Sequence, residues 1–281
     1  MLVTLLIALR EGLEAALIVG IMLGYLKKTG QMAHSRQIWV GVAAAVALSV
    51  ALAAGIQIAG AELEGAAEQI FEGTAMLLAV IVLTWMVIWM RTQARTMKTS
   101  LEHKLQSALG GGATFGLAAV AFLAVFREGV ETALLLSAAA FTTDALGALA
   151  GAVIGLALAT LIGALIYAST IRLNLGLFFS VTSLFLLAFA AGLLAHSVHE
   201  FQEAGLLFTL NEHVWDLGGI LSDDAGLGQI LAIIFGYQSS PSLESVVVYW
   251  AYWAATLVGV RWWLDRRLGR PATNQAVTAG V

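Results

Sequence analysis

The sequence predicts an all-α protein that forms a single integral membrane domain with seven transmembrane helices. Of its 281 residues, 60% are hydrophobic and only 11% are charged, and the mean hydropathy is +0.89. A soluble domain carries about a quarter charged residues, so this composition indicates a membrane protein. The chain has no cysteine, which excludes disulfides and thiolate metal sites. Its net charge of −4 argues against nucleic acid as a partner.

Seven segments are apolar over the length of about 20 residues that a helix needs to cross the hydrocarbon layer. They are roughly 2–26, 38–60, 68–90, 113–141, 146–170, 177–197 and 244–264. The first has no basic region before it, and Arg10 and Glu11 interrupt it, so we expect a retained span rather than a cleaved signal peptide. The segment 227–237 is apolar but too short to cross, so it would lie on the membrane or re-enter it.

The connections between these segments alternate in charge. The connection 27–37 is basic, the turn after the second segment is acidic, and the stretch 91–104 is basic again. The long connection after the sixth segment is acidic, whereas the tail carries arginines. Under the positive-inside rule, this pattern predicts the N-terminus outside and the C-terminus inside, in the cell inner (plasma) membrane. Four tryptophans would then lie at the cytoplasmic interface: Trp85, Trp89, Trp262 and Trp263.

One charged motif, Arg-Glu-Gly-x-Glu, interrupts two of the apolar segments, at 10–14 and at 127–131. The copies are 127 − 10 = 117 residues apart, in the first and fourth segments, which run in opposite directions. This spacing favours two inverted three-helix repeats, an arrangement common in transporters that have a substrate site near the membrane midplane. We therefore divide the chain into repeat one (1–105), repeat two (106–200), an external loop (201–243), and the seventh span with a cytoplasmic tail (244–281).

Within each motif the two glutamates are three residues apart and share a helix face. The arginine lies four residues before the second glutamate, so it can reach a carboxylate on its own helix. Gly12 and Gly129 remove bulk beside the charges, so we expect the two motif helices to approach each other there. Glu72 in the third segment adds a carboxylate that has no counterpart in the sixth, where Ala191 stands instead.

These charges predict a cation site at the midplane. Six charged side chains inside the membrane cost on the order of 15–20 kcal/mol if nothing relieves them. Four glutamates and two arginines leave a charge of −2, or −3 with Glu72, and carboxylate oxygens suit hard cations such as Mg²⁺, Ca²⁺, Mn²⁺ or iron. The alternative is a structural ion-pair staple between the two helices. The predicted metal ligands are Glu11, Glu14, Glu128, Glu131 and Glu72, with Arg10 and Arg127 as charge-balancing partners.

A second polar group lies at the external end of the sixth segment. Four side chains share one helical stripe there, at i, i+3, i+4 and i+7: His196, His199, Glu200 and Glu203. Imidazole and carboxylate at this spacing can capture a transition metal at the entrance. The alternative is a polar helix end that faces water.

The duplicated motif resembles that of the high-affinity iron permease family (the oxidase-dependent iron transporter family), in particular its bacterial EfeU branch. The resemblance covers nearly the whole chain, including Glu72-Gly73, Trp215-Asp216, "FGYQSSPS" before the last span, and Glu200-x-x-Glu203. It implies iron as a transported substrate, with no resident cofactor, and passage along the motif glutamates. It also implies that Fe²⁺ is oxidised outside and crosses as Fe³⁺, with a periplasmic EfeO-like protein and an EfeB-like haem peroxidase as partners.

The residues alone leave other functions open. A transporter of Mn²⁺ or another divalent cation, importing or exporting, would use the same carboxylates. A haem-bearing membrane electron carrier needs paired histidines inside the spans, whereas all five histidines lie in connections or at span ends: His34, His103, His196, His199 and His213. No Ser/His/Asp set converges at one depth, so we expect a transporter and not an enzyme.

Overall fold

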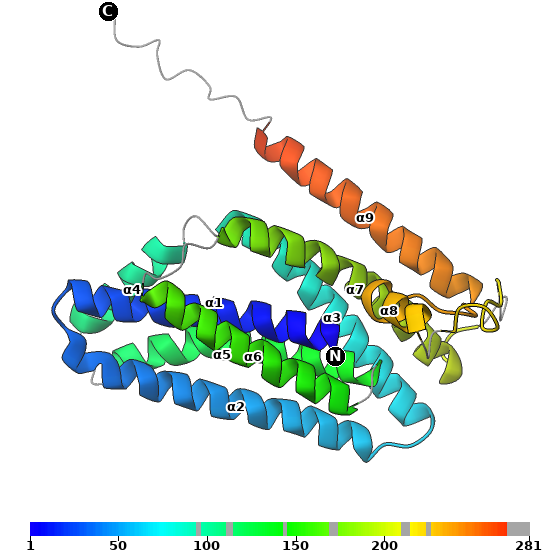
Figure 1. Cartoon of the computed structure of the whole chain (residues 1–281), viewed down its shortest axis with the longest axis horizontal. Coiled ribbons are helices and arrows are strands. Elements are labelled where there is room, and N and C mark those ends of the chain that lie inside the picture. Colours follow the sequence, from blue (N-terminus) through cyan, green and yellow to red (C-terminus); the bar gives the residue numbers. More distant parts are fainter. Residues whose placement is uncertain are drawn as a thin grey trace, which may run out of the picture.

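The computed structural model describes residues 1–93, 97–110, 115–142, 145–168, 174–208, 214–222 and 226–268. Within these ranges all regular structure is helical, which confirms the predicted all-α class (Figure 1). The helices are α1 (Leu2–Lys28), η1 (Met32–His34), α2 (Ser35–Ala61), α3 (Ala66–Gln93), α4 (Met97–Gly110), α5 (Gly116–Phe141), α6 (Ala145–Tyr167), α7 (Leu175–Glu203), α8 (Gly226–Phe235) and α9 (Leu243–Leu268).

The long helices follow the predicted apolar segments in order. Four described stretches are long and apolar enough to cross a membrane: 32–61, 66–90, 145–167 and 176–203. The helices α1 and α5 are also long, with 27 and 26 residues, but each carries the charged motif in its interior. The stretch predicted as a basic connection contains a helix, α4, because Leu101 and Leu105 bury one of its faces against α1, α2 and α5.

The long helices pack in pairs whose members are distant in sequence. In each of the pairs α1 with α6, α2 with α5, and α3 with α7, the two helices lie side by side (Figure 1). The last long helix, α9, contacts the bundle mainly through α7. Tyr252 of α9 adds a hydrogen bond between its hydroxyl and that of Thr84 on α3, at 2.8 Å.

The motif glycines do not bring α1 and α5 together, in contrast to the expectation from the sequence. A methyl group at Gly12 would meet the Ala159 Cβ of α6 at 2.7 Å, and one at Gly129 would collide with the Ser49 side chain of α2. Each glycine therefore faces the helix that packs most extensively on its own helix. The physical reason is the helical period, which places the glycine on a different face from the glutamates that flank it.

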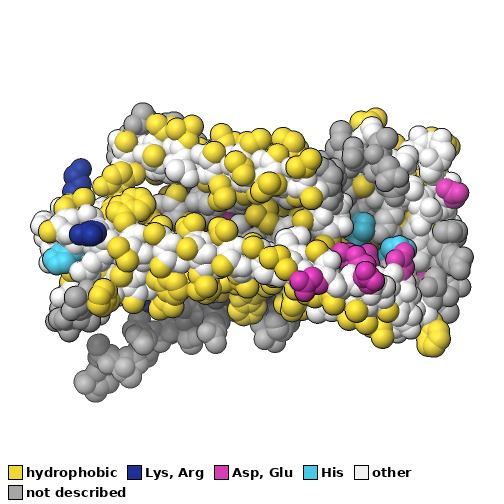
Figure 2. Space-filling view, turned by 90° about the horizontal axis from the view of Figure 1, so that it is seen from below, with side chains coloured by type: hydrophobic (Ala, Val, Ile, Leu, Met, Phe, Trp, Pro, Cys, Tyr) yellow, Lys and Arg dark blue, Asp and Glu magenta, His cyan; other side chains and the backbone are white. Residues whose placement is uncertain are grey.

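The two ends of the bundle differ in charge. Figure 2 shows basic side chains with histidine at one end, acidic side chains with histidine at the other, and mostly hydrophobic side chains between them. We call the first the basic end; its exposed side chains include Lys27, Lys28 and Arg36. The second is the acidic end, with exposed side chains that include Glu62, Glu64, Glu68 and Glu203.

The short helix α8 packs on α7 at the acidic end. Just after it, Gly236 has φ +68° and brings its Cα directly against Gly192 of α7. Gly192 lies 203 − 192 = 11 residues from the end of α7, or about 16 Å along the helix axis. The end of this apolar segment therefore lies beside α7 about three helical turns before α7 ends.

Candidate metal centre

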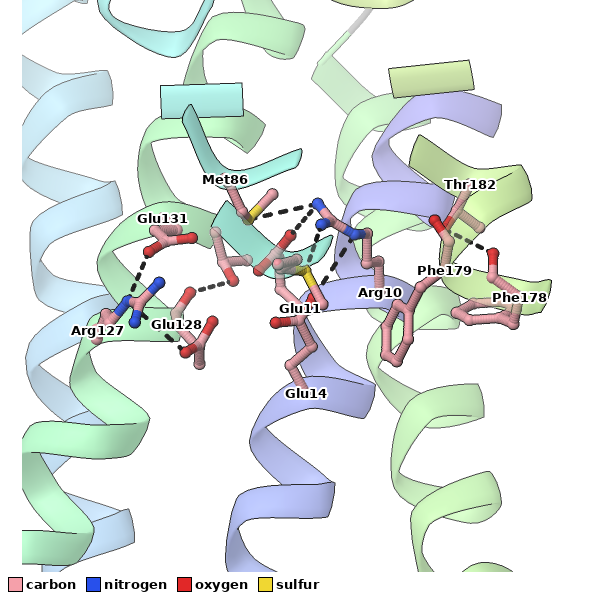
Figure 3. Close-up of polar contacts among 12 residues, drawn as sticks. Arg10, Glu11, Glu14, Met86, Arg127, Glu128, Glu131, Phe178, Phe179 and Thr182 are labelled. Atoms are coloured by element: carbon pink, nitrogen blue, oxygen red, sulfur yellow. Dashed lines mark hydrogen bonds and ion pairs between the residues drawn. The ribbon is translucent and has the colours of Figure 1, made fainter. Parts of the chain in front are cut away.

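The two charged motifs meet at the centre of the bundle. Glu11 of α1 and Glu128 and Glu131 of α5 each offer a carboxylate oxygen, and these three atoms lie within 4.8 Å of one another. Glu11 and Glu128 are buried and Glu131 is nearly so. Figure 3 shows the carboxylates gathered between Arg127 on one side and Arg10 on the other. The predicted convergence of the two motifs is therefore present in the structure.

Arg10 is enclosed by its own helix and by α3. Its side chain is fully buried, and its Nη1 donates to Glu11 Oε1 at 3.2 Å. Its Nε lies 3.6 Å from Glu14 Oε1, as the spacing of four residues predicts. The guanidinium also donates to two thioether sulfurs of α3, Met86 at 3.3 Å and Met90 at 2.7 Å.

Arg127 repeats the ion pairs of Arg10 in a more open setting. Its Nε donates to Glu131 Oε1 at 3.0 Å and lies 3.9 Å from Glu128 Oε1. Its side chain is 41% exposed, whereas that of Arg10 is fully buried. In place of two sulfurs, its guanidinium faces the Trp89 ring of α3, 4.0 Å from the ring centre. The two motifs are therefore alike in sequence but differ in how firmly each arginine is held.

The arginines leave one oxygen of each clustered carboxylate unused. Glu11, Glu128 and Glu131 each direct Oε1 to an arginine, while their Oε2 atoms are buried and accept no hydrogen bond from the described residues. A buried carboxylate oxygen without a donor is costly unless a cation or water meets it. One oxygen from each of these three carboxylates also lies within 4.8 Å of the other two, which makes an oxygen-only donor set that suits a hard or borderline cation.

Trp89, Met86 and Met90 could not be assigned to this site from the sequence. Trp89 was expected at the membrane interface, but it contacts Arg127. Trp85, one turn away on α3, is 68% exposed, as an interfacial residue would be, and the side chains of Trp262 and Trp263 lie outside the described part. The only available signal was spacing: the two methionines are four residues apart, and so share a face of α3.

Glu72 does not join the central cluster, which corrects the predicted ligand set. Met86 is the α3 residue beside Arg10, and it lies 86 − 72 = 14 residues beyond Glu72. That separation is about 21 Å along a helix, so Glu72 is too near the acidic end to reach Glu11. It lies instead within electrostatic range of Glu68 and of Glu200 on α7.

The predicted outer stripe is divided between different partners. His199 Nε2 lies 3.2 Å from Glu203 Oε1, and Gln69 of α3 donates to the other oxygen of Glu203 at 3.0 Å. Glu200 faces the carboxylates of α3, and the His196 ring contacts the Gly192 carbonyl of its own helix at 3.1 Å. In the described part of the acidic end, these residues do not bring three ligand atoms together as the central cluster does.

Comparison with known proteins decides which family this arrangement belongs to. The family model described as "Iron permease FTR1 family" matches residues 1–265 of the chain. The chain belongs to this iron permease family. The chain is 42% identical over 278 residues to "Ferrous iron permease EfeU" of Shigella sonnei (strain Ss046), and the match covers 98% of this chain and 100% of the relative.

Other relatives of the iron permease agree with this assignment. A "Ferrous iron permease EfeU" of Escherichia coli O6:K15:H31 (strain 536 / UPEC) is 43% identical over 260 residues, covering 92% of this chain and 94% of the relative. One of Yersinia pestis is 40% identical over 260 residues, covering 92% of each chain. No solved structure matches this chain.

Proposed function

We propose that this protein imports iron across the cell inner membrane through the central cluster of α1 and α5. The observation that carries the proposal is the cluster of Glu11, Glu128 and Glu131. Three of their carboxylate oxygens lie within 4.8 Å of one another, and each carboxylate has a buried oxygen that no described residue satisfies. Four carboxylates and two guanidinium groups leave a formal charge of −2 in a low-dielectric setting. A passing cation would offset this charge, and the arginines would keep its affinity low enough for release.

The proposed orientation places the acidic end outside and the basic end in the cytoplasm. The positive-inside rule supports it, because Lys27, Lys28 and Arg36 gather at one end of the bundle. All seven long helices, α9 included, would then cross the membrane. The helix pairing supports inverted repeats, since the motif helix of each half packs on the second long helix of the other, α1 on α6 and α5 on α2.

Iron would first gather at the acidic end. Glu68 and Glu72 of α3 and Glu200 and Glu203 of α7 lie near one another there, and their field would raise the local concentration of cations. This arrangement supports attraction of iron to the entrance, with Glu72 acting at the mouth and not at the midplane.

The proposed form in the pore is Fe³⁺, which is the harder ion and which suits an oxygen-only donor set. The relatives are named ferrous iron permeases, so Fe²⁺ would be the form supplied. Each Fe²⁺ would lose one electron to peroxide on an external EfeB-like haem peroxidase, assisted by an EfeO-like protein. A membrane-impermeant chelator of Fe²⁺, added during uptake from an Fe³⁺ source, should then leave uptake intact.

Uptake of radioactive iron by iron-depleted cells tests the proposal. Glu128→Gln and Glu131→Gln keep the side-chain shape but remove a charge and a ligand oxygen, so both should abolish uptake at equal surface expression. Glu62→Gln makes the same change on an exposed residue of the acidic end and should leave uptake intact. Normal uptake by both cluster variants, with a loss of thermal stability only, would favour the structural staple.

A second candidate substrate is Mn²⁺, because the same carboxylate oxygens suit it. Competition in the uptake assay separates the two. If iron is the substrate, a tenfold excess of Mn²⁺ should leave iron uptake nearly unchanged. Strong inhibition by Mn²⁺, together with uptake of radioactive Mn²⁺, would reassign the transporter.

A further inference from the structure

A cavity of about 470 Å³ opens at the basic end between α1, α4 and α6. Its wall on α1 runs from Ala16, two residues after Glu14, to Lys27 and Lys28. Glu102 of α4 lies at the same mouth. Six waters occupy roughly 180 Å³ at about 30 Å³ each, so a hydrated metal ion fits in this volume. We call this cavity the vestibule.

The vestibule begins where a close seam between α1 and α6 ends. Small residues line the seam, and the two residues of each facing pair are 147 positions apart in the sequence. Gly155 faces Ala8, Ala159 faces Gly12, and Gly163 faces Ala16. The next pair in this register is Gly20 with Tyr167, because 20 + 147 = 167. Tyrosine cannot continue a seam of small residues, so the two helices part there.

Two glycines of α1 leave the vestibule open. A methyl group at Gly20 or at Gly24 would meet no atom within 4 Å, and both glycines line the cavity. Leu17 is three residues beyond Glu14 on the same side of α1, and it also lines the cavity. Three residues, or about 4.5 Å of helix rise, therefore separate Glu14 from Leu17 at the top of the vestibule.

The corresponding place in the other half of the chain is filled. Adding the offset of 117 residues between the motifs to Gly24 gives Phe141 of α5. The Phe141 ring packs edge-on against Phe71 of α3, with ring centres 6.2 Å apart, over Gly60 of α2. An apolar cluster that includes Val3, Ile7 and Leu135 also lies on the acidic side of the carboxylates.

We infer that the vestibule is the exit route of the ion, and that the structure shows the state open towards the basic end. The ion would leave Glu14, pass Leu17, and reach the mouth along the glycine face of α1. Lys27 and Lys28 would prevent it from being retained there. This inference rests on the proposed transport function, but the accessibility that it requires does not depend on transport.

Single cysteines provide the test, because the natural chain has no cysteine. We would introduce Gly20→Cys and Gly24→Cys, with Gly55→Cys as the matched control, since Gly55 also has open space around it but lies on the exposed apolar face of α2. Thr29→Cys, exposed beside Lys28, marks the membrane face that carries the basic end. The probe is a small charged methanethiosulfonate added to sealed vesicles of either orientation.

We expect Gly20→Cys and Gly24→Cys to react from the face that labels Thr29→Cys, at least tenfold faster than Gly55→Cys. Modification of Gly24→Cys should then block iron uptake, while modified Thr29→Cys should still transport. Two results would overturn the exit route. One is equal reactivity of Gly20→Cys, Gly24→Cys and Gly55→Cys, and the other is full transport after modification of Gly24→Cys. A different result would separate the two ideas: fast labelling of Gly20→Cys and Gly24→Cys, together with normal iron uptake by Glu128→Gln and Glu131→Gln. It would overturn the proposed function but still show that the vestibule is open to water at the basic end.

A plugging variant adds a measurement that separates the exit from the binding site. Gly24→Leu should fill the vestibule without touching the cluster, so the purified protein should still bind iron while uptake falls at least tenfold. Gly55→Leu should bind and transport normally. Normal uptake by Gly24→Leu would contradict the inference.

Discussion

The Arg127 guanidinium lies over the Trp89 ring, 4.0 Å from its centre, and this contact connects α3 to the more exposed of the two motifs. A cation over an indole ring gains about 0.5–2 kcal/mol, depending on how far it is desolvated. Arg127 is 41% exposed, and the ring packs against the same guanidinium that pairs with Glu131.

Trp89→Leu should therefore reduce iron uptake severalfold, since the aliphatic side chain removes the attraction between ring and cation. Trp89→Phe should retain part of the activity, because a phenyl ring still attracts a cation, although more weakly. The measurement is the initial rate of iron uptake at matched expression. Trp85→Leu is the control, being 68% exposed on the same helix, and an equal loss there would refute a specific role for Trp89.

Arg10→Met should destabilise the protein far more than Arg127→Met. Removing one partner of a buried ion pair costs about 3–5 kcal/mol, because the other charge remains buried and unpaired. Arg10 is fully buried, whereas Arg127 is partly exposed. Thermal unfolding of the purified variants in detergent checks this order. Adding Glu11→Gln to Arg10→Met should restore part of the lost stability; if it lowers stability further, the ion pair is not the cause.

Gly129→Ala should destabilise the packing of α5 on α2 by about 1–3 kcal/mol, the usual cost of overpacking. The added methyl group would collide with the Ser49 side chain. Ser49→Gly removes that obstacle, so the double variant should be more stable than Gly129→Ala alone. Unfolding midpoints of the three proteins measure the coupling, and simple additivity would show that the two positions are not in contact.

Tyr252→Phe should lower stability only slightly. It removes the hydroxyl that forms a 2.8 Å hydrogen bond with Thr84, and such bonds between membrane helices contribute about 0.6 kcal/mol on average. Because α9 packs mainly on α7, its position should survive the change. A loss as large as that of Arg10→Met would mean that this bond anchors α9 to the bundle.

Much of the architecture could be predicted from the sequence because apolar length is a strong signal. The seven apolar segments, the convergence of the two motifs and the pairing of each arginine with the glutamate four residues later all follow from helix geometry. The helices that pack against Gly12 and Gly129 could not be predicted. A glycine indicates that another helix approaches closely, but it does not identify which helix. The pairings of α1 with α6 and α2 with α5 depend on contacts between distant parts of the chain.

The prediction that Glu72 is a ligand of the central cluster was wrong for the same reason, because it depends on contacts between distant parts of the chain. Its membership of an apolar segment was correct, but depth along a helix depends on where the helix begins relative to its neighbours. Met86 and not Glu72 proved to lie level with Arg10. The contacts of Met90 and Trp89 were equally hidden, since thioether and indole side chains in an apolar helix resemble ordinary lipid-facing residues in sequence.

The seam between α1 and α6 also restricts how the molecule can move. Its tightest part lies at Gly151 and Gly155, which meet backbone atoms of α1, so closure beyond Gly163 requires a pivot and not a slide. From Gly12 to Lys28 the lever arm is 16 residues, or about 24 Å, so a tilt of about 10° displaces the tip by about 4 Å. A rotation of this size would therefore narrow the mouth of the vestibule at the basic end.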